Sequence, residues 1–189
     1  MADSRARVWT FLVYPESAPV GWISTLESFH VPFCVSPLHE FDKNPTGELK
    51  KAHFHVVIAF SGKKSYEQVY DICKSINQPR PEVVNDIRSM VRYLIHRDNP
   101  EKFQYDKRLI QAFNGFNFRN YFEFSKEEKY DIIADMLDFI DDNHIVEIAT
   151  FSQYCRACNR EKWWPIYCDY NRLFDVHIRS LRNGFNCIK

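Results

Sequence analysis

Hydrophobic and polar positions along the first two thirds of the chain follow two different periods. Segments rich in β-branched and aromatic residues are typical of strands, and they lie at residues 7–15, 31–42, 52–60 and 106–113, with an extended piece within 79–87. Segments with apolar residues every three or four positions are typical of amphipathic helices, and they lie at residues 20–30, 65–76 and 86–96. Strands and helices that alternate with antiparallel neighbours predict an α+β fold with helices on one face of a sheet.

The character of the chain changes near residues 118–124. Ser125 and Glu128 form a capping-box pattern at the start of a helix. Apolar residues then recur at helical spacing, namely Ile133, Met136, Leu137, Ile140, and later Phe174, Ile178 and Leu181. We therefore predict two domains, one with the sheet over residues 1–120 and an all-helical one over residues 121–189.

Composition limits the class of protein. The net charge is zero, but residues 1–120 hold 16 basic against 13 acidic side chains and residues 121–189 hold 9 against 12. These counts exclude a protein whose whole surface is strongly basic. The acidic second part is typical of a module for self-association or partner binding. No apolar run approaches the roughly 20 residues that span a bilayer. The N-terminus has no signal-peptide pattern, so we expect a soluble cytoplasmic protein whose six cysteines are reduced.

Two histidines one residue apart, His53 and His55, begin the strand predicted at 52–60. Residues i and i+2 of a strand point to the same face, so both imidazoles project together and Phe54 points the other way. Neutral ring nitrogens are good ligands for divalent ions. Two exposed polar side chains on an ordinary strand would give the same pattern, so the pair alone leaves the choice open.

The preceding strand can complete a metal site. His39 and Asp42 lie where that strand leaves the sheet, and the loop at 42–51, which contains proline and glycine, returns directly to His53. Three histidines and a carboxylate suit Mn²⁺ or a similar ion with open coordination positions. Glu40 is an alternative carboxylate.

Tyr93 lies on the predicted helix at 86–96, away from the apolar stripe of that helix. It shares its flank with Ser89, His96 and Arg97, so its phenol is available to solvent or to a ligand. A phenol can act as a nucleophile where a metal polarises an acceptor phosphate and a base or cation eases loss of the phenolic proton. Most half-exposed helical tyrosines have no chemical role, and position alone does not exclude that interpretation.

Two other patterns carry less weight. The stretch AFSGKKSY resembles a phosphate-binding loop but lacks the first glycine of that motif and has Lys64 at its Ser or Thr position, which excludes a nucleotide-hydrolysing motor. A zinc set could be drawn from Cys155, Cys158, Cys168 and His177. Because these residues lie at irregular spacing in helix-like, aromatic-rich sequence, we expect buried reduced thiols there instead.

Four ordered motifs resemble those of one family. FLVYPES, SPLHEFD, KKAHFHVVI and RYLIHRDNPEKFQYD follow one another between about residues 8 and 108. Together they are similar to the Rep initiators of small rolling-circle plasmids, of the streptococcal type often called RepB, within the HUH endonucleases. The resemblance implies a five-stranded antiparallel sheet flanked by helices, with a ferredoxin-like or RRM-like topology, followed by a helical C-terminal domain.

The resemblance also implies an activity and its residues. In such enzymes a tyrosine attacks a phosphodiester at the plasmid's nick site, the 5′ end stays linked to that tyrosine, and the free 3′-OH primes synthesis. The nucleophile of the family falls on Tyr93. The family's ligands for a divalent ion, Mn²⁺ or Mg²⁺, fall on His39, Asp42, His53 and His55. Tyr105 is the nearest rival nucleophile, but it follows Pro100, outside the predicted helix.

Further expectations concern DNA and partners. Candidate contacts to DNA are Lys43, Lys50, Lys51, His96 and Arg97, although a solvated surface charge is the simpler interpretation of each lysine. The resemblance implies that the domain over 1–120 binds origin repeats as duplex, nicks a single-stranded site and rejoins strands at termination. It also implies a homo-oligomer through the helices of 121–189, in a bacterial cytoplasm with a host helicase and polymerase. The alternative is a non-catalytic origin-binding or regulatory protein with the same fold.

Overall fold

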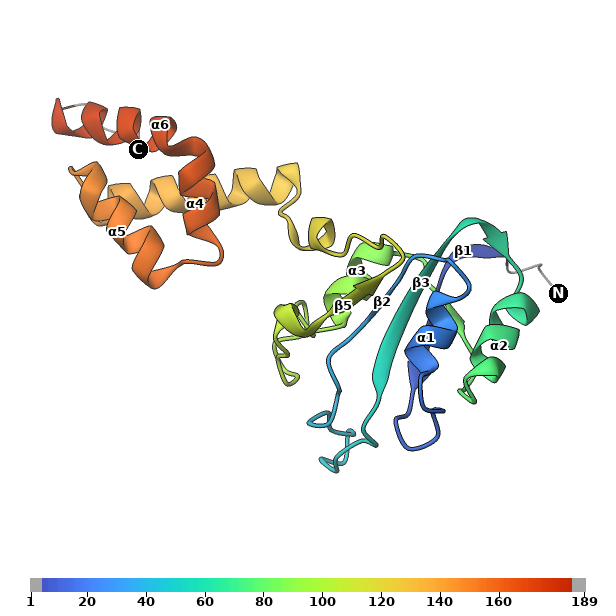
Figure 1. Cartoon of the computed structure of the whole chain (residues 1–189). Helices are drawn as coiled ribbons and strands as arrows, with labels where there is room; N and C mark the ends of the chain where they lie inside the picture. Colours follow the sequence, from blue (N-terminus) through green and yellow to red (C-terminus); the bar gives the residue numbers. More distant parts are fainter. Residues whose placement is uncertain (1–4, 185–189) are drawn as a thin grey trace. The chain divides into compact units, whose positions relative to one another are not determined.

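A five-stranded antiparallel sheet forms the centre of the N-terminal part of the chain (Figure 1). The computed structural model describes residues 5–184. The strands are β1 (Ala6–Val13), β2 (Phe33–Val35), β3 (Phe54–Lys64), β4 (Glu82–Val83) and β5 (Gln111–Phe113), in the spatial order β4-β1-β3-β2-β5. The long strands β1 and β3 pair at the centre, with Trp9 opposite Ile58 and Val13 opposite Phe54. The predicted α+β class with a five-stranded antiparallel sheet is confirmed.

Helices cover both faces of this sheet. They are α1 (Trp22–Glu27), α2 (Tyr66–Ser75) and α3 (Ile87–Tyr93), with short 3₁₀ helices η1 (Lys107–Leu109) and η2 (Arg119–Phe122). Val56 and Ile58 of β3 pack with side chains of α1 and α2, whereas Val57 packs on the opposite face with Val91 of α3. The expectation of helices on one face is therefore wrong. The unbroken apolar run in β3 places hydrophobic side chains on both faces, and each face needs a cover.

The helix α3 is shorter than its apolar pattern predicts. Asp86 caps its start by accepting a hydrogen bond from the backbone N–H of Arg88. The helix ends at Tyr93, and His96 then takes a left-handed backbone conformation with φ of 58°. His96 and Arg97 therefore follow the helix and do not continue the flank on which Tyr93 lies, contrary to the expectation from helical spacing.

A second compact unit begins at Phe124. It consists of the helices α4 (Lys126–Asp142), α5 (Ile148–Cys158) and α6 (Trp163–Arg182). Ser125 and Glu128 form the predicted capping box at the start of α4, because each side chain accepts a hydrogen bond from the other residue's backbone N–H. All three helices contribute fully buried side chains to one core, among them Met136, Phe151 and Phe174. This unit therefore has a hydrophobic core of its own.

The cysteines of the second unit differ from expectation. Cys155 is buried as expected, but Cys158 and Cys168 are exposed. His177 is hydrogen-bonded to a carboxylate of α4. Within residues 5–184, no group of side chains with metal-binding geometry includes any of these four residues. Cys187 lies outside the described residues.

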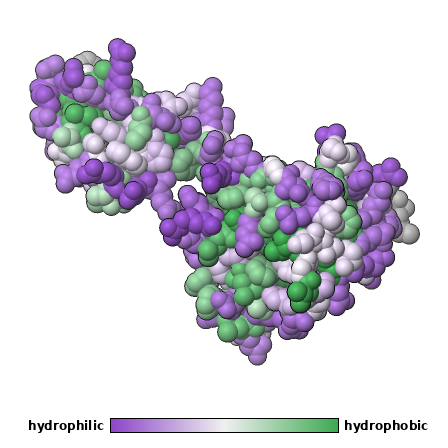
Figure 2. All heavy atoms as spheres, in the orientation of Figure 1, coloured by the Kyte–Doolittle hydropathy of each residue, from purple (hydrophilic) through white to green (hydrophobic). Residues whose placement is uncertain are grey.

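The surface of each unit is mainly hydrophilic on the face seen in Figure 2, with patches of hydrophobic side chains. In the part of the chain that the structure describes, no helix is long and apolar enough to cross a membrane. Several large apolar side chains are nevertheless exposed on the N-terminal unit, among them Phe41 and Phe103.

Candidate metal centre and reactive tyrosine

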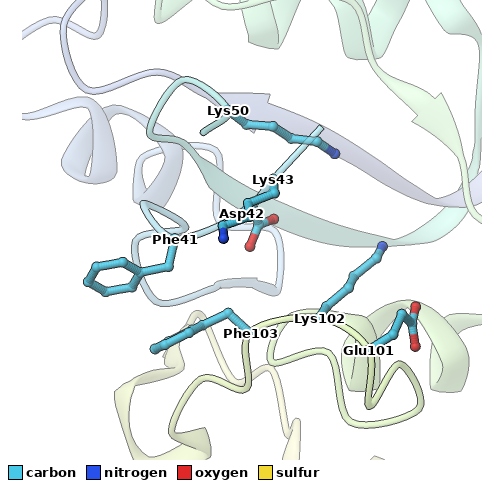
Figure 3. A pocket seen from close by; sticks show the side chains of 7 residues that line it. All are labelled: Phe41, Asp42, Lys43, Lys50, Glu101, Lys102 and Phe103. Carbon is cyan, nitrogen blue, oxygen red and sulfur yellow. The ribbon is translucent and has the colours of Figure 1, made fainter. Parts of the chain in front are cut away.

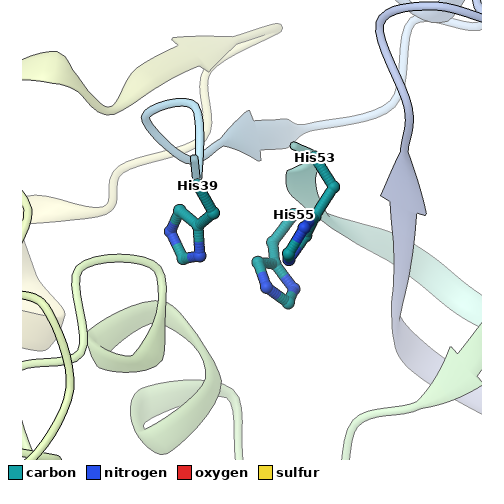
Figure 4. Close-up of side chains that lie close together, drawn as sticks. All are labelled: His39, His53 and His55. Atoms are coloured by element: carbon teal, nitrogen blue, oxygen red, sulfur yellow. The ribbon is translucent and has the colours of Figure 1, made fainter. Parts of the chain in front are cut away.

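Three histidines converge past the end of β2 and at the start of β3. The strand predicted at 31–42 is regular only in β2, and past it His39 pairs with His53 in an isolated antiparallel bridge. Each backbone N–H donates to the other residue's carbonyl, with N–O distances of 2.8 and 3.3 Å. His55 follows as the second residue of β3. The three ring centres lie 4.9 to 5.5 Å apart, and Figure 4 shows the rings of His53 and His55 beside that of His39.

Two further buried side chains adjoin His39. Asp42 Oδ2 lies 3.3 Å from His39 Nδ1 and 3.6 Å from His96 Nε2. Two overlapping groups could thus hold a metal ion, His39 with His53 and His55, and His39 with Asp42 and His96. The structure brings the four predicted ligands into one cluster and adds His96 to it. Because the ring of His96 is fully buried, it offers no surface to DNA, and the expectation of a DNA contact there is corrected.

Backbone carbonyls determine which ring nitrogen of each buried histidine carries a proton. His39 Nε2 lies 2.9 Å from the carbonyl oxygen of Leu94, and His96 Nδ1 lies 2.8 Å from that of Phe103. A carbonyl oxygen only accepts, so each of these nitrogens donates and the opposite nitrogen keeps its lone pair. Those opposite nitrogens, Nδ1 of His39 and Nε2 of His96, are buried and have no hydrogen-bond partner within the described residues.

These two buried nitrogens without hydrogen-bond partners are available as ligands, and for this reason the site fits a cation. A buried polar atom without a partner costs about 1–3 kcal/mol. A divalent ion bound by both lone pairs would remove that cost, and hydrogen bonds from the second ring nitrogen to carbonyls are the usual support of metal-bound histidines. His53 has the same support, since its Nδ1 donates to the carbonyl oxygen of Lys51 at 2.7 Å and leaves Nε2 for a ligand.

The imidazoles of His39 and His55 are held in the neutral form that metal binding requires. Burial, with smaller contributions from the neighbouring histidines and Lys102, lowers the pKa of His55 to about 2. Burial also lowers the pKa of His39, although the Leu94 carbonyl and Asp42 act in the opposite direction. A proton therefore does not compete with a metal ion for these nitrogens near neutral pH.

Tyr105 supports the cluster from its buried side. Its hydroxyl donates to Asp42 Oδ1 at 3.0 Å, and its ring stacks on that of His39 with centres 4.2 Å apart. Burial raises the pKa of Tyr105 to about 12. The hydroxyl of this rival nucleophile is therefore engaged in holding Asp42. The alternative carboxylate, Glu40, is exposed, whereas Asp42 is buried among the histidines.

Tyr93, the last residue of α3, lies against the histidine cluster. Its ring stands edge-on to those of His55, at 5.4 Å, and His96, at 5.0 Å between centres. Lys102 donates a hydrogen bond from Nζ to the hydroxyl oxygen of Tyr93 at 2.9 Å, and this ammonium lies 4.5 Å from the centre of the ring. The sequence interpretation missed Lys102 as a site residue. The only signal was its place in the motif DNPEKFQYD, just after Pro100, where the chain turns back.

The lysines predicted to contact DNA differ in their surroundings. Lys43 and Lys50 are exposed and line a pocket beside Asp42. Lys51 is instead engaged, because its ammonium forms an ion pair with Glu16 and lies 4.8 Å from the ring centre of Tyr14. Lys43 and Lys50 are therefore more available than Lys51 to contact a phosphate near the cluster.

Comparison with known protein families decides what kind of protein carries this site. Residues 1–119 match the model described as plasmid replication protein, origin binding domain, and residues 126–183 match the one described as replication protein RepB, C-terminal. The chain belongs to the RepB family of plasmid replication proteins. In this RepB-family chain the sheet, the histidine cluster and Tyr93 all lie within the origin-binding domain, and α4–α6 form the RepB C-terminal domain.

Similarity to individual replication proteins extends through both units. A replication protein of Staphylococcus aureus is 36% identical over 181 residues, which cover 95% of this chain and 91% of the relative. Replication protein RepB of Lactiplantibacillus plantarum is 40% identical over 171 residues, with 90% and 78% covered. Replication protein RepB of Streptococcus agalactiae is 33% identical over 168 residues, with 76% and 80% covered.

Proposed function

We propose that this RepB-family protein starts plasmid replication by nicking one DNA strand at the origin, with Tyr93 as the nucleophile. The observation that carries the proposal is the position of the Tyr93 hydroxyl, 2.9 Å from the ammonium of Lys102, with the ring against His55 of the histidine cluster. Membership of a family with an origin-binding domain supplies the substrate, the plasmid origin. Duplex repeats and a single-stranded nick site within it would both be bound.

The reaction exchanges one phosphoester bond for another. The Tyr93 oxygen attacks the phosphorus of the scissile phosphodiester, and the phenolic proton passes to solvent. The bond from phosphorus to the 3′ oxygen breaks, and this oxygen takes up a proton to become the free 3′-OH that primes synthesis. The 5′ phosphate stays on Tyr93 as a phosphotyrosine. Attack of a 3′-OH on that phosphotyrosine reverses the exchange and rejoins strands at termination.

The surrounding side chains divide the remaining tasks. Lys102 counters negative charge at the Tyr93 oxygen and on the phosphate while the bond forms. The residues that would hold a divalent ion are His39, Asp42, His53 and His55, together with His96. Such an ion, when bound, supplies Lewis-acid stabilisation of charge on the phosphate oxygens. A set rich in imidazole favours Mn²⁺ over Mg²⁺, which prefers oxygen ligands and water.

The C-terminal unit is proposed to assemble copies of the chain. Its helix α6 exposes Leu173 (44%) and Val176 (55%), which lie three residues apart on one flank. Exposed apolar side chains that gather on one surface commonly mark a contact with another protein. The chain carries no phosphate-binding loop of a motor, so strand unwinding would fall to a host helicase and synthesis to a host polymerase.

The test uses a supercoiled plasmid that carries the cognate origin, incubated with the protein and Mn²⁺. Wild-type protein should give nicked circles and a protein–DNA adduct that survives denaturation. Tyr93→Phe should reduce both by at least about 10³-fold, since it removes the nucleophile. Tyr66→Phe, a change in α2 away from the cluster, is the matched control and should leave both unchanged.

Two outcomes would overturn parts of this proposal. Nicking by Tyr93→Phe at the wild-type rate would show that another group attacks the phosphate. Wild-type protein that binds an origin fragment but gives neither nick nor adduct would favour the alternative, a non-catalytic origin-binding protein with the same fold.

A further inference from the structure

A pocket of about 350 Å³ lies beside the histidine cluster. Its walls come from two loops, the one that follows His39 and the one that follows α3 (Figure 3). The residues that line it are Phe41, Asp42, Lys43, Lys50, Glu101, Lys102 and Phe103. Neither the family match nor the nicking mechanism assigns anything to the two phenylalanines.

Two exposed aromatic rings form one end of this pocket. Phe41 and Phe103 are 49% and 48% exposed, and their ring centres lie 4.7 Å apart at an angle of 40°. Neither ring belongs to a hydrophobic core of the unit. Unpaired nucleic-acid bases commonly stack on exposed aromatic side chains such as these.

Cationic side chains form the other end. In Figure 3 the ammonium groups of Lys50 and Lys102 lie away from the two phenylalanine rings, on the opposite side of the pocket. Neither Lys43 nor Lys50 forms an ion pair with another residue among those described. Three lysines thus face two carboxylates, and Asp42 is already engaged with Tyr105 and the histidines.

Hydrogen bonds fix both ends of the pocket to the cluster. The carbonyl oxygen of Phe103 accepts from His96 Nδ1 at 2.8 Å, and the backbone N–H of Phe41 donates to the Tyr105 hydroxyl at 3.1 Å. Lys102, which lines the pocket, also donates to the Tyr93 hydroxyl. A ligand held between the rings and the lysines would therefore be held at a fixed position relative to Tyr93.

We propose that this pocket binds one nucleotide of single-stranded DNA next to the scissile phosphate. The base stacks on Phe41 and Phe103, and its phosphate lies against Lys43, Lys50 and Lys102. Aromatic rings at one end and ammonium groups at the other match the two chemically different halves of a nucleotide. A base paired within duplex DNA does not expose its face, so the occupant is an unpaired strand. The inference rests on the proposed nicking function for the place of the scissile phosphate, but binding itself needs no cleavage.

The experiment measures binding with Tyr93→Phe protein, so that its result does not depend on nicking. The probes are two fluorescein-labelled strands: one of about twelve thymidines, a length typical of a single-strand binding module, and one of the same length without bases. Protein with intact phenylalanines should bind the thymidine strand about tenfold more tightly than the abasic strand. This ratio corresponds to the free energy gained when one base stacks on an aromatic side chain. Phe41→Ala/Phe103→Ala should remove this preference and leave affinity for the abasic strand unchanged.

Matched variants separate stacking from charge and from misfolding. Phe29→Ala, another exposed phenylalanine of the same unit, should keep the preference. Lys43→Met/Lys50→Met should weaken binding of both strands equally and reduce its salt dependence. Phe103→Trp should keep the preference and show quenching of tryptophan fluorescence by the thymidine strand but not by the abasic one.

The proposal is overturned by any of three results. The first is equal affinity of the unaltered pocket for the two strands. The second is a preference that survives the double alanine substitution. The third is a double variant whose DNA binding is unchanged but whose mass in sedimentation is smaller, which would make the two rings a contact between copies of the chain.

Discussion

Lys102 donates a hydrogen bond across 2.9 Å to the hydroxyl oxygen of Tyr93, from a loop nine residues further along the chain. The same ammonium lies over the ring of Tyr93. It is therefore a cation in direct contact with the atom that we propose to attack DNA, and it also lines the pocket that we assign to a nucleotide. This one contact connects the reactive group to the surface that would position its substrate.

Replacing Lys102 should slow formation of the covalent adduct. Lys102→Met removes the positive charge beside the Tyr93 oxygen, and we expect the single-turnover rate on a single-stranded substrate to fall about 10²-fold. Lys102→Arg keeps the charge and should recover part of the rate. Lys107→Met, an exposed lysine outside the cluster, serves as the control. A rate for Lys102→Met equal to that of wild type would remove Lys102 from the mechanism.

His96 should contribute to metal binding although it was not among the ligands predicted from the sequence. Its Nε2 is buried without a hydrogen-bond partner, 3.6 Å from Asp42. His96→Ala should weaken Mn²⁺ binding about 10- to 100-fold in calorimetry, and His53→Ala/His55→Ala should abolish it. His30→Ala, at an exposed histidine, should bind Mn²⁺ as wild type does. Undiminished binding by the double variant would rule out an ion at this cluster.

Acid should destabilise the metal-free protein through the buried histidines. Burial lowers the pKa of His39 and His55 in the folded protein, whereas both titrate near 6.5 in an unfolded chain. Below that pH the unfolded chain binds protons that the folded protein does not, so the free energy of unfolding falls as the pH falls. Thermal unfolding in EDTA should therefore show a Tm that decreases from about pH 7 to about pH 5. His55→Gln should make this decrease smaller, and an equal decrease in both proteins would contradict the assignment.

The exposed flank of α6 should determine the size of the assembly. Leu173→Lys/Val176→Lys places two charges where we propose that copies of the chain meet, so sedimentation should show a smaller mass. Cleavage of a single-stranded substrate by the N-terminal unit should persist. Val146→Lys, another exposed apolar position of the same unit, is the control. An unchanged mass for the double variant would place the contact between copies elsewhere.

Much of the fold could be predicted from local pattern. The register of His53 and His55 followed from the period of a strand, and the start of α4 followed from the capping pair Ser125 and Glu128. The packing of α3 on the second face of the sheet could not be predicted from local pattern. A continuous apolar strand shows that both faces are buried but does not say which segment covers each of them.

The candidate site was predictable where its residues share a strand or a short loop. His96 was not predicted as a metal ligand because the helical period was extended past Tyr93. The chain in fact leaves the helix there and takes a left-handed turn at His96. That turn, unusual for a residue other than glycine, directs the ring inward. Lys102 escaped as a partner because its contact with Tyr93 spans the turn near Pro100, and a sequence pattern does not show where such a turn returns. Tyr105 escaped because its partners Asp42 and His39 lie far away in the sequence.

The two hydrogen bonds from His39 to the Leu94 carbonyl and from His96 to the Phe103 carbonyl have a consequence for how the site could change over evolution. Main-chain atoms of the segment that carries Tyr93 and Lys102 fix the orientation of two rings of the candidate metal centre. Carbonyl oxygens are present whatever the side chain, so the exposed position 103 can vary in side-chain chemistry without altering this support, whereas Leu94 is kept apolar by the core around it. The alignment of Tyr93 with the histidine rings would then persist among relatives in which the side chain at position 103, which we propose to contact DNA, differs to suit a different origin.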